Sequence, residues 1–239
     1  MPPSPSNRKQ HFLAGARDTF PLLVGAWPFG LIYGALGIAS GLSPLATAAM
    51  SAVVFAGSAQ FIAVSLVAAS TPVLVIALTT FVVNARHILY AATLAPQLKG
   101  LPTRWLVPLG FWLTDESFVV AANGFEARNT PEDRKWYLLG SEIAMFLNWQ
   151  IATWVGIAAG QAIPDPASWG LEFALVVTFI GMLVPMLKGR PELISVLVAA
   201  GTALLANSLP HRSGLLLAAV LGIVAGLLAE QAWGRKEPA

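Results

Sequence analysis

Cysteine is absent from this chain of 239 residues, and charged residues make up only 11% of it. The lack of cysteine excludes disulfide bonds, thiolate metal sites and a cysteine nucleophile. The three histidines are scattered along the sequence, so we expect no metal site and no cofactor. A net charge of +2 excludes the broad basic surface that is typical of nucleic-acid-binding proteins.

Hydrophobic residues are abundant instead. They make up 56% of the chain, against about 45–50% in an average soluble domain, and the mean hydropathy is +0.69. A hydropathy window of about 19 residues finds eight apolar segments separated by Gly, Pro, Ser or charge. The segments are Phe20–Ile38, Ala46–Ala69, Val73–Leu94, Trp105–Ala122, Trp136–Ile163, Leu171–Leu187, Leu193–Leu209 and Leu215–Trp233.

This pattern predicts an all-α integral membrane protein, a polytopic bundle of about eight transmembrane helices with broken or re-entrant segments. Seven spans are the alternative, because the turn near Ser70–Pro72 carries no charge. Residues 1–18 are expected to form a cytoplasmic leader, residues 19–234 the transmembrane domain and residues 235–239 a cytoplasmic tail.

The distribution of lysine and arginine predicts the orientation. With eight spans and the N-terminus inside, the inner segments hold Arg8, Lys9, Arg17, Arg128, Arg134, Lys135, Lys188, Arg190, Arg235 and Lys236, and the outer ones hold Lys99, Arg104 and Arg212. This bias places both termini in the cytoplasm. It also places Trp105 and Trp169 at the outer interface, and Trp136 and Trp233 at the inner one.

Three charged residues lie in the middle of apolar segments. Arg86 is central in residues 71–98, and Asp115 with Glu116 is central in residues 104–123. A charge at the centre of a membrane helix costs roughly 2.5–3.5 kcal/mol on insertion scales. Arg86 is either a bidentate ligand for a substrate carboxylate or a counter-ion for one of the two acids.

The two acids point about 100° apart on a helix, so only one of them needs to face Arg86. The other acid is free for a coupling proton or a substrate ammonium. Glu116 is favoured as the free acid, because Trp112 and Asn123 share its face, although the sequence leaves the choice open.

Other polar residues near the middle of the apolar segments are candidates for substrate binding or proton coupling. Ser58 and Gln60 follow Gly57, where a helix break is expected to aim backbone N–H groups at a carboxylate. Ordinary packing through small residues is the alternative for Ser58. The remaining candidates are Tyr33, Asn84 and His87. Glu142 is expected to reach the cytoplasmic interface.

Several of these motifs together resemble the AzlC family, the large subunit of branched-chain amino-acid exporters. The resemblance rests on Pro28-Phe29-Gly30 with Tyr33-Gly34, on Ser51 to Phe61, on Asn84-x-Arg86-His87-x-Leu89-Tyr90 and on Thr114-Asp115-Glu116. It implies export of leucine, isoleucine, valine and sometimes methionine across the bacterial inner membrane. It also implies a second, AzlD-like membrane subunit of about four spans.

The sequence therefore predicts a proton-coupled secondary transporter and no enzyme. A channel or scaffold subunit of a membrane complex is the main alternative. An intramembrane hydrolase using Ser58 and His87 is a weaker one, because the chain has no G-x-S-x-G, G-x-S-G, H-E-x-x-H or G-x-G-D pattern.

Overall fold

The computed structural model describes residues 5–162, 180, 183–184, 187, 189–206, 209 and 213–233. These residues form helices and connecting turns without a strand, which confirms the all-α fold. Arg8–Ala39, Val73–Leu98 and Pro131–Ala162 are long and apolar enough to cross a bilayer. The predicted segment Leu171–Leu187 lies largely outside the described residues.

Contacts within the chain divide it into two compact units. The first unit contains Met1–Phe61 and Asn84–Leu171, and the second contains Ile62–Val83 and Glu172–Ala239. The three mid-segment charges all belong to the first unit.

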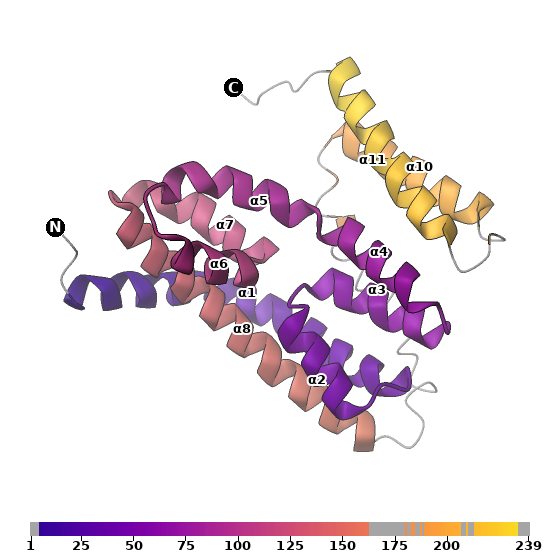
Figure 1. Ribbon diagram of the computed structural model, residues 1–239, viewed down its shortest axis with the longest axis horizontal. Helices are drawn as coiled ribbons and strands as arrows, with labels where there is room; N and C mark the ends of the chain where they lie inside the picture. Colours follow the sequence, from indigo (N-terminus) through magenta and orange to yellow (C-terminus); the bar gives the residue numbers. More distant parts are fainter. Residues whose placement is uncertain are drawn as a thin grey trace. The chain divides into compact units, whose positions relative to one another are not determined.

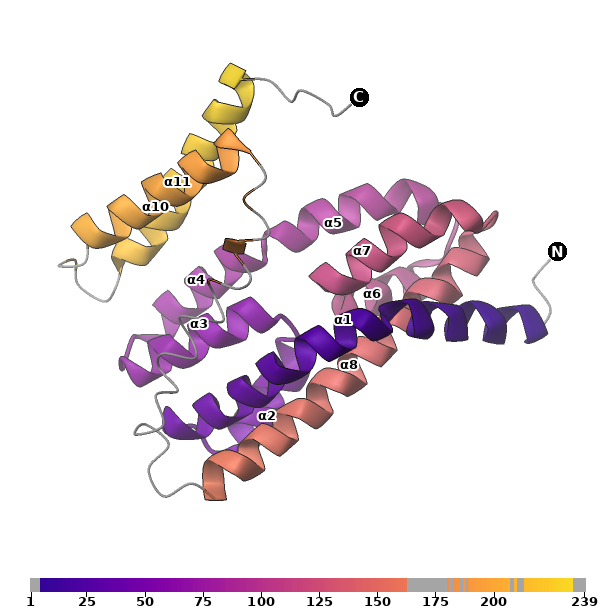
Figure 2. The same cartoon turned by 180° about the vertical axis from the view of Figure 1, so that it is seen from behind.

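Two long helices, α1 (Pro5–Ala39) and α8 (Pro131–Ala162), form the frame of the first unit. They lie side by side in Figures 1 and 2. They run parallel, because Gly15 of α1 packs on Tyr137 of α8 and Gly34 packs further along on Thr153. Glycine has no side chain, which allows this close contact between the two backbones.

Helix α1 begins at Pro5, so the expected leader continues without a break into the first span. Thr19, the first residue of the expected transmembrane domain, is fully buried and its hydroxyl bonds Ser141 at 2.6 Å. The N-terminal segment of α1 is therefore part of the packed frame of this unit.

The next two apolar segments are each divided into two helices. Helices α2 (Pro44–Val53) and α3 (Gly57–Ala68) are separated by residues 54–56, and α4 (Val73–Asn84) is separated from α5 (Arg86–Leu94) at Ala85. A short 3-10 helix, η1 (Ala95–Leu98), follows α5. The break expected near Gly57 is therefore present, whereas the break at Ala85 was not predicted from the sequence.

The fourth apolar segment is a re-entrant hairpin of α6 (Thr103–Trp112) and α7 (Asp115–Gly124), followed by the 3-10 helix η2 (Phe125–Ala127). Trp105, near the start of α6, contacts Trp136 with ring centroids 5.5 Å apart. Gly124, at the end of α7, packs on the Tyr137 ring. Both ends of the hairpin thus lie beside the first turns of α8.

This geometry corrects the prediction of a fourth span. The tip of the hairpin follows Trp112, whose ring centroid lies 6.0 Å from that of Phe146. Trp136 and Phe146 are about 15 Å apart along α8 at 1.5 Å per residue, which is about half of the hydrocarbon thickness. The expected placement of Trp105 and Trp136 at opposite interfaces is therefore wrong. The prediction failed because a hydropathy window cannot distinguish a membrane span from a hairpin of equal length.

The hairpin packs on its neighbours through a cluster of buried apolar side chains. The cluster joins α5, η1, α6, α7 and α8 through Leu94, Leu98, Leu109, Leu113, Val120, Ala121, Phe125, Tyr137 and Leu138. Burial of these apolar side chains attaches the hairpin to α8.

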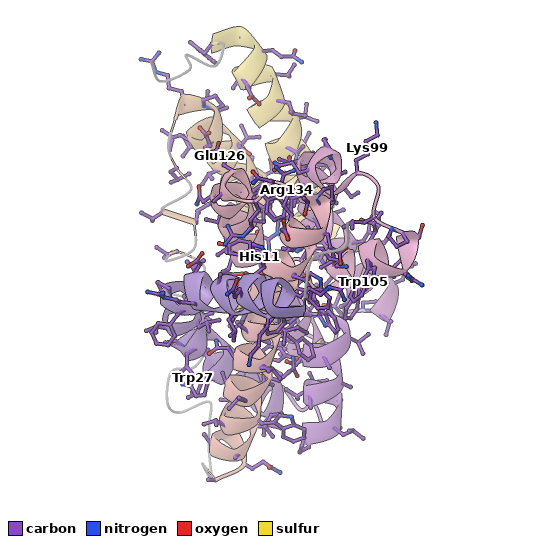
Figure 3. The ribbon with its side chains drawn as sticks, turned by 90° about the vertical axis from the view of Figure 1, so that its left-hand side faces the viewer. His11, Trp27, Lys99, Trp105, Glu126 and Arg134 are labelled. Atoms are coloured by element: carbon purple, nitrogen blue, oxygen red, sulfur yellow. The ribbon has the colours of Figure 1, made fainter. Side chains whose placement is uncertain are left out.

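Basic side chains of the first unit gather where α8 begins. Arg8 and Lys135 lie against the Trp136 ring, and Arg128 lies over Tyr137. Arg134 donates to the backbone oxygen of Gln97, close to Lys99. Figure 3 looks onto this end and labels His11, Lys99, Trp105, Glu126 and Arg134.

In the second unit, α10 (Arg190–Leu205) packs on α11 (Ser213–Trp233). Gly222 and Gly226 face Ser195, whose hydroxyl donates to the Gly222 carbonyl oxygen at 2.8 Å. The G-x-x-x-G spacing here also serves helix packing.

Candidate functional site

Three of the half-helices begin with the polar residues that the sequence singled out. Ser58 is in the first turn of α3, Arg86 is the first residue of α5, and Asp115 is the first residue of α7. The α7 break has a clear local cause, because Thr114 and Ser117 form a reciprocal capping box. An acid in the first turn of α7 is favourable, since the free N–H groups there carry partial positive charge.

These three residues meet at one point of the first unit. The Arg86 Nη2 atom lies 2.9 Å from Asp115 Oδ2 and donates to Ser58 Oγ at 2.6 Å. The Tyr90 hydroxyl donates to Asp115 Oδ1 at 2.5 Å. The acid that pairs with Arg86 is therefore Asp115, a choice that the sequence left open.

Glu116 is left without Arg86 as an ion-pair partner. Its carboxylate is held by the Thr114 side chain and by its own backbone N–H. His87 lies next to Arg86, and its Nδ1 atom is 3.0 Å from the carbonyl oxygen of Asn84. Its ring packs edge-on against Tyr90, with centroids 5.7 Å apart.

A pocket of about 320 Å³ opens where the three helix breaks meet. Its walls are mostly apolar, with Asn84 and His87 as the polar exceptions. The lining residues are Val53, Val54, Phe55, Ala56, Asn84, His87, Gly110, Phe111 and Leu113. Its size and its mixture of apolar walls and few polar groups are typical of a small-molecule site.

Three buried polar atoms around this pocket have no hydrogen-bond partner. They are the Asn84 Oδ1 acceptor and the Arg86 Nε and Trp112 Nε1 donors. Asn84 lines the pocket, and Arg86 and Trp112 are within two residues of lining residues. Unpaired buried polar groups are costly, so a ligand that pairs with them gains affinity.

The polar side-chain atoms of Gln60 and Tyr33 form hydrogen bonds within the protein. The fully buried Gln60 amide donates to the carbonyl oxygens of Met50, Ser51 and Val54, and accepts a hydrogen bond from Trp149 Nε1 at 3.0 Å. The Tyr33 hydroxyl donates to the Thr47 carbonyl oxygen at 2.9 Å. Both residues thus hydrogen-bond to backbone carbonyls of α2, and Gln60 also to that of Val54, so their polar atoms are already paired within the protein.

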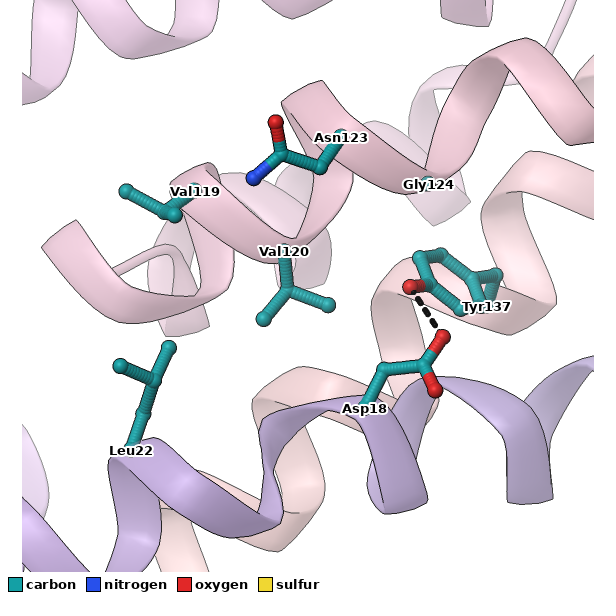
Figure 4. Close-up of a pocket in the computed structure, with 7 residues that line it drawn as sticks. All are labelled: Asp18, Leu22, Val119, Val120, Asn123, Gly124 and Tyr137. Carbon is teal, nitrogen blue, oxygen red and sulfur yellow. Dashed lines mark hydrogen bonds between the residues drawn. The ribbon is translucent and has the colours of Figure 1, made fainter.

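A second pocket, of about 290 Å³, lies between α1, α7 and α8. Figure 4 shows its lining, in which the Tyr137 hydroxyl donates to Asp18 Oδ2 at 2.7 Å. Asn123 of α7 also lines this pocket. Asp18 and Tyr137 were not predicted as site residues, because both lie at the ends of apolar segments, where polar residues are common.

The environment of Glu142 differs most from what the sequence predicted. Its side chain is fully buried, and neither carboxylate oxygen has a hydrogen-bond partner. The prediction that it reaches the interface is therefore wrong. The position of Glu142 near the end of the apolar segment was misleading, because α1, α6 and α7 all pack on α8.

These features define an integral membrane protein with broken helices around a mid-segment polar site. The model of the AzlC protein family matches residues 21–163, so the chain belongs to the AzlC family. It is a family of membrane transport proteins, and the match runs from Pro21, within α1, through the end of α8 and includes all three helix breaks.

Three membrane or transport proteins are similar to this chain over most of its length. The inner membrane protein YgaZ of Escherichia coli is 26% identical, covering 95% of this chain and 92% of the relative. The branched-chain amino acid transport protein AzlC of Bacillus subtilis is 26% identical, covering 91% and 86%. A membrane protein of Archaeoglobus fulgidus is 30% identical, covering 91% of both chains. No solved structure matches the chain.

Proposed function

We propose that this chain is a secondary transporter subunit that exports leucine, isoleucine and valine from the cytoplasm, coupled to protons. The observation that carries the proposal is the meeting of three helix breaks at one pocket, with the Arg86–Asp115 pair on residues adjacent to its lining. Non-helical backbone inside a membrane protein is tolerated where it is buried or lines a cavity, and transporters use such breaks to bind substrates. The name of the Bacillus subtilis relative supports the substrate class.

The unpaired polar atoms fit the backbone of a free amino acid. Arg86 Nε and Trp112 Nε1 are donors that suit a carboxylate, and Asn84 Oδ1 is an acceptor that suits an ammonium group. The Arg86–Asp115 pair is neutral as a whole, so the site needs no net charge from its ligand. A zwitterion therefore matches the site better than a purely anionic or cationic solute.

The apolar walls fit a branched side chain. Phe55, Phe111 and Leu113 line the pocket and offer no polar atom of their side chains to the substrate. Burial of an aliphatic side chain of this size contributes roughly 1.5–3 kcal/mol. A charged side chain would lose its hydration here without gaining a partner.

The basic end of the first unit supports a cytoplasmic N-terminus. The positive-inside rule puts the end with Arg8, Arg128, Arg134 and Lys135 in the cytoplasm. Because the α6–α7 hairpin returns to this end, Lys99 and Arg104 belong there too, and not outside as the eight-span prediction had them.

The absence of cysteine in the natural chain allows a direct test of this topology. In single-cysteine variants, Lys99→Cys is expected to react with a membrane-impermeant maleimide only from the cytoplasmic side. Ser40→Cys, in the turn that follows α1, is expected to react only from the outside. Labelling of both variants from the same side would contradict the hairpin topology.

The transport function is tested by counterflow. The purified chain, with and without an AzlD-like small subunit, is placed in liposomes preloaded with unlabelled leucine. We expect labelled leucine to enter in a saturable manner, and preloaded glutamate or lysine to give no exchange. The small subunit is proposed from the family resemblance, and this comparison shows whether transport depends on it.

Two other functions predict different outcomes. A channel would give a flux that does not saturate and needs no preloaded leucine. A hydrolase using Ser58 and His87 is disfavoured, because the Ser58 hydroxyl is engaged by Arg86, while His87 lies at the Asn84 carbonyl.

A further inference from the structure

Glu142 of α8 is a carboxyl group that the proposed substrate site does not use. It is 0% exposed, and neither of its oxygens has a hydrogen-bond partner. The other buried charged residues of α8 are paired, since Asp133 lies 3.2 Å from His11 Nε2 and Lys135 bonds Glu132. Packing therefore gives no reason for an acid at position 142.

The neighbours of Glu142 on its helix show where it points. Leu138, one turn earlier, belongs to the cluster that packs under the α6–α7 hairpin. Phe146, one turn later, contacts Trp112 at the hairpin tip and Phe55 at the α2–α3 break. Residues four apart share a helix face. Glu142 therefore lies on the face of α8 that the hairpin covers, between the core cluster and the substrate pocket.

No ionisable group on the packed helices pairs with it among the described residues. Asp18 of α1 is bonded to Tyr137. On α7, Asp115 is paired with Arg86, and Glu116 is held by Thr114. Helix α2 and η1 contain no ionisable side chain, and the ionisable residue of α6 is Arg104, near its start.

A buried carboxylate with no partner is too costly to stay ionised. Glu142 therefore holds a proton in this conformation. Glu142 lines neither of the two pockets described above, so water does not reach it from them in this conformation. Movement of the hairpin away from α8 would let water reach the acid, and the proton would pass from its carboxyl oxygen to that water.

We propose that Glu142, and not Asp115 or Glu116, is the proton-carrying group of this transporter. This inference rests on the proposed transport function. Glu142 is protonated while the hairpin covers it and releases its proton to water when the hairpin uncovers it. The Arg86–Asp115 pair keeps a constant charge through the cycle and serves the substrate.

The test separates leucine exchange from proton coupling in the same liposomes. Wild-type protein is expected to show counterflow, and also leucine accumulation driven by an imposed pH gradient. One pH unit drives up to about tenfold accumulation when one proton is coupled. Glu142→Gln imitates the protonated acid, so we expect it to retain counterflow and to lose the accumulation.

Matched variants complete the test. Glu126→Gln, at the basic end, is expected to behave like the wild type. Glu142→Asp keeps a carboxyl group, so we expect it to retain part of the pH-driven leucine accumulation that Glu142→Gln loses. Full pH-driven accumulation by Glu142→Gln would overturn the proposal. So would loss of counterflow and accumulation together in a stably inserted Glu142→Gln protein, since that marks a packing role.

The controls also distinguish this inference from the proposal on which it rests. Wild-type protein without leucine counterflow would refute the transport function itself. Wild-type counterflow that ignores the pH gradient would leave the transport function standing and refute the proton role of Glu142.

Discussion

Replacement of Arg86 by glutamine is expected to abolish leucine counterflow while the protein still reaches the membrane. The change removes the partner of Asp115 and the donor to Ser58, together with the unpaired Nε donor that we assign to the substrate carboxylate. A hydrogen bond to a charged group contributes about 1.5–3 kcal/mol. The loss of this contact alone corresponds to about 10–150-fold in apparent affinity.

A double variant distinguishes substrate binding from a structural ion pair. If Arg86 were only a counter-ion, Arg86→Gln combined with Asp115→Asn would restore transport, because no unpaired charge would remain. We expect the double variant to be better folded than Arg86→Gln but still inactive. Recovery of counterflow in the double variant would contradict the substrate role of Arg86.

Two further variants calibrate this result. Arg86→Lys keeps the charge and loses the planar fork, so a partial loss of affinity is expected. Arg104→Gln removes an arginine from the basic end of the first unit and is expected to leave leucine exchange unchanged. Counterflow is measured at several leucine concentrations, so that apparent affinity and maximal rate are separated.

The second large effect concerns folding and arises where α1 meets α8. A methyl group added at Gly34 would overlap the backbone carbonyl oxygen of Thr153. Overpacking of this kind costs about 1–3 kcal/mol or more, since backbone cannot move aside as a side chain can. We expect Gly34→Ala to lower the amount of folded protein in the membrane and its thermal stability in detergent.

Gly25 provides the matched control on the same helix. A methyl group added there meets no atom within 4 Å. Alanine is favoured over glycine in a helix by about 1 kcal/mol, so Gly25→Ala is expected to be neutral or stabilising. Fluorescence-detected size-exclusion chromatography after heating compares the two variants. Equal stability of both would show that α1 and α8 do not pack as described.

Several properties of this protein follow from the sequence alone, because they depend on composition and local pattern. Its apolar content predicts an all-α membrane protein, and the unusual depth of Arg86, Asp115 and Ser58 marks them as candidates. The break near Gly57 is likewise local, since small and polar residues interrupt an apolar segment. The family assignment also rests on motifs that are contiguous in sequence.

Tertiary structure decided how these residues are used. Asp115 and Glu116 are adjacent in sequence and chemically alike, and only the direction of α7 brings Asp115 to Arg86 while leaving Glu116 with Thr114. Residues 105–122 have the length and hydropathy of a span whether they cross the membrane or fold back. The contacts of Trp105 with Trp136 and of Gly124 with Tyr137 show that they fold back as a hairpin. Burial of Glu142 depends on helices distant in sequence. The sequence determines which groups are available at membrane depth, and long-range packing determines which of them meet.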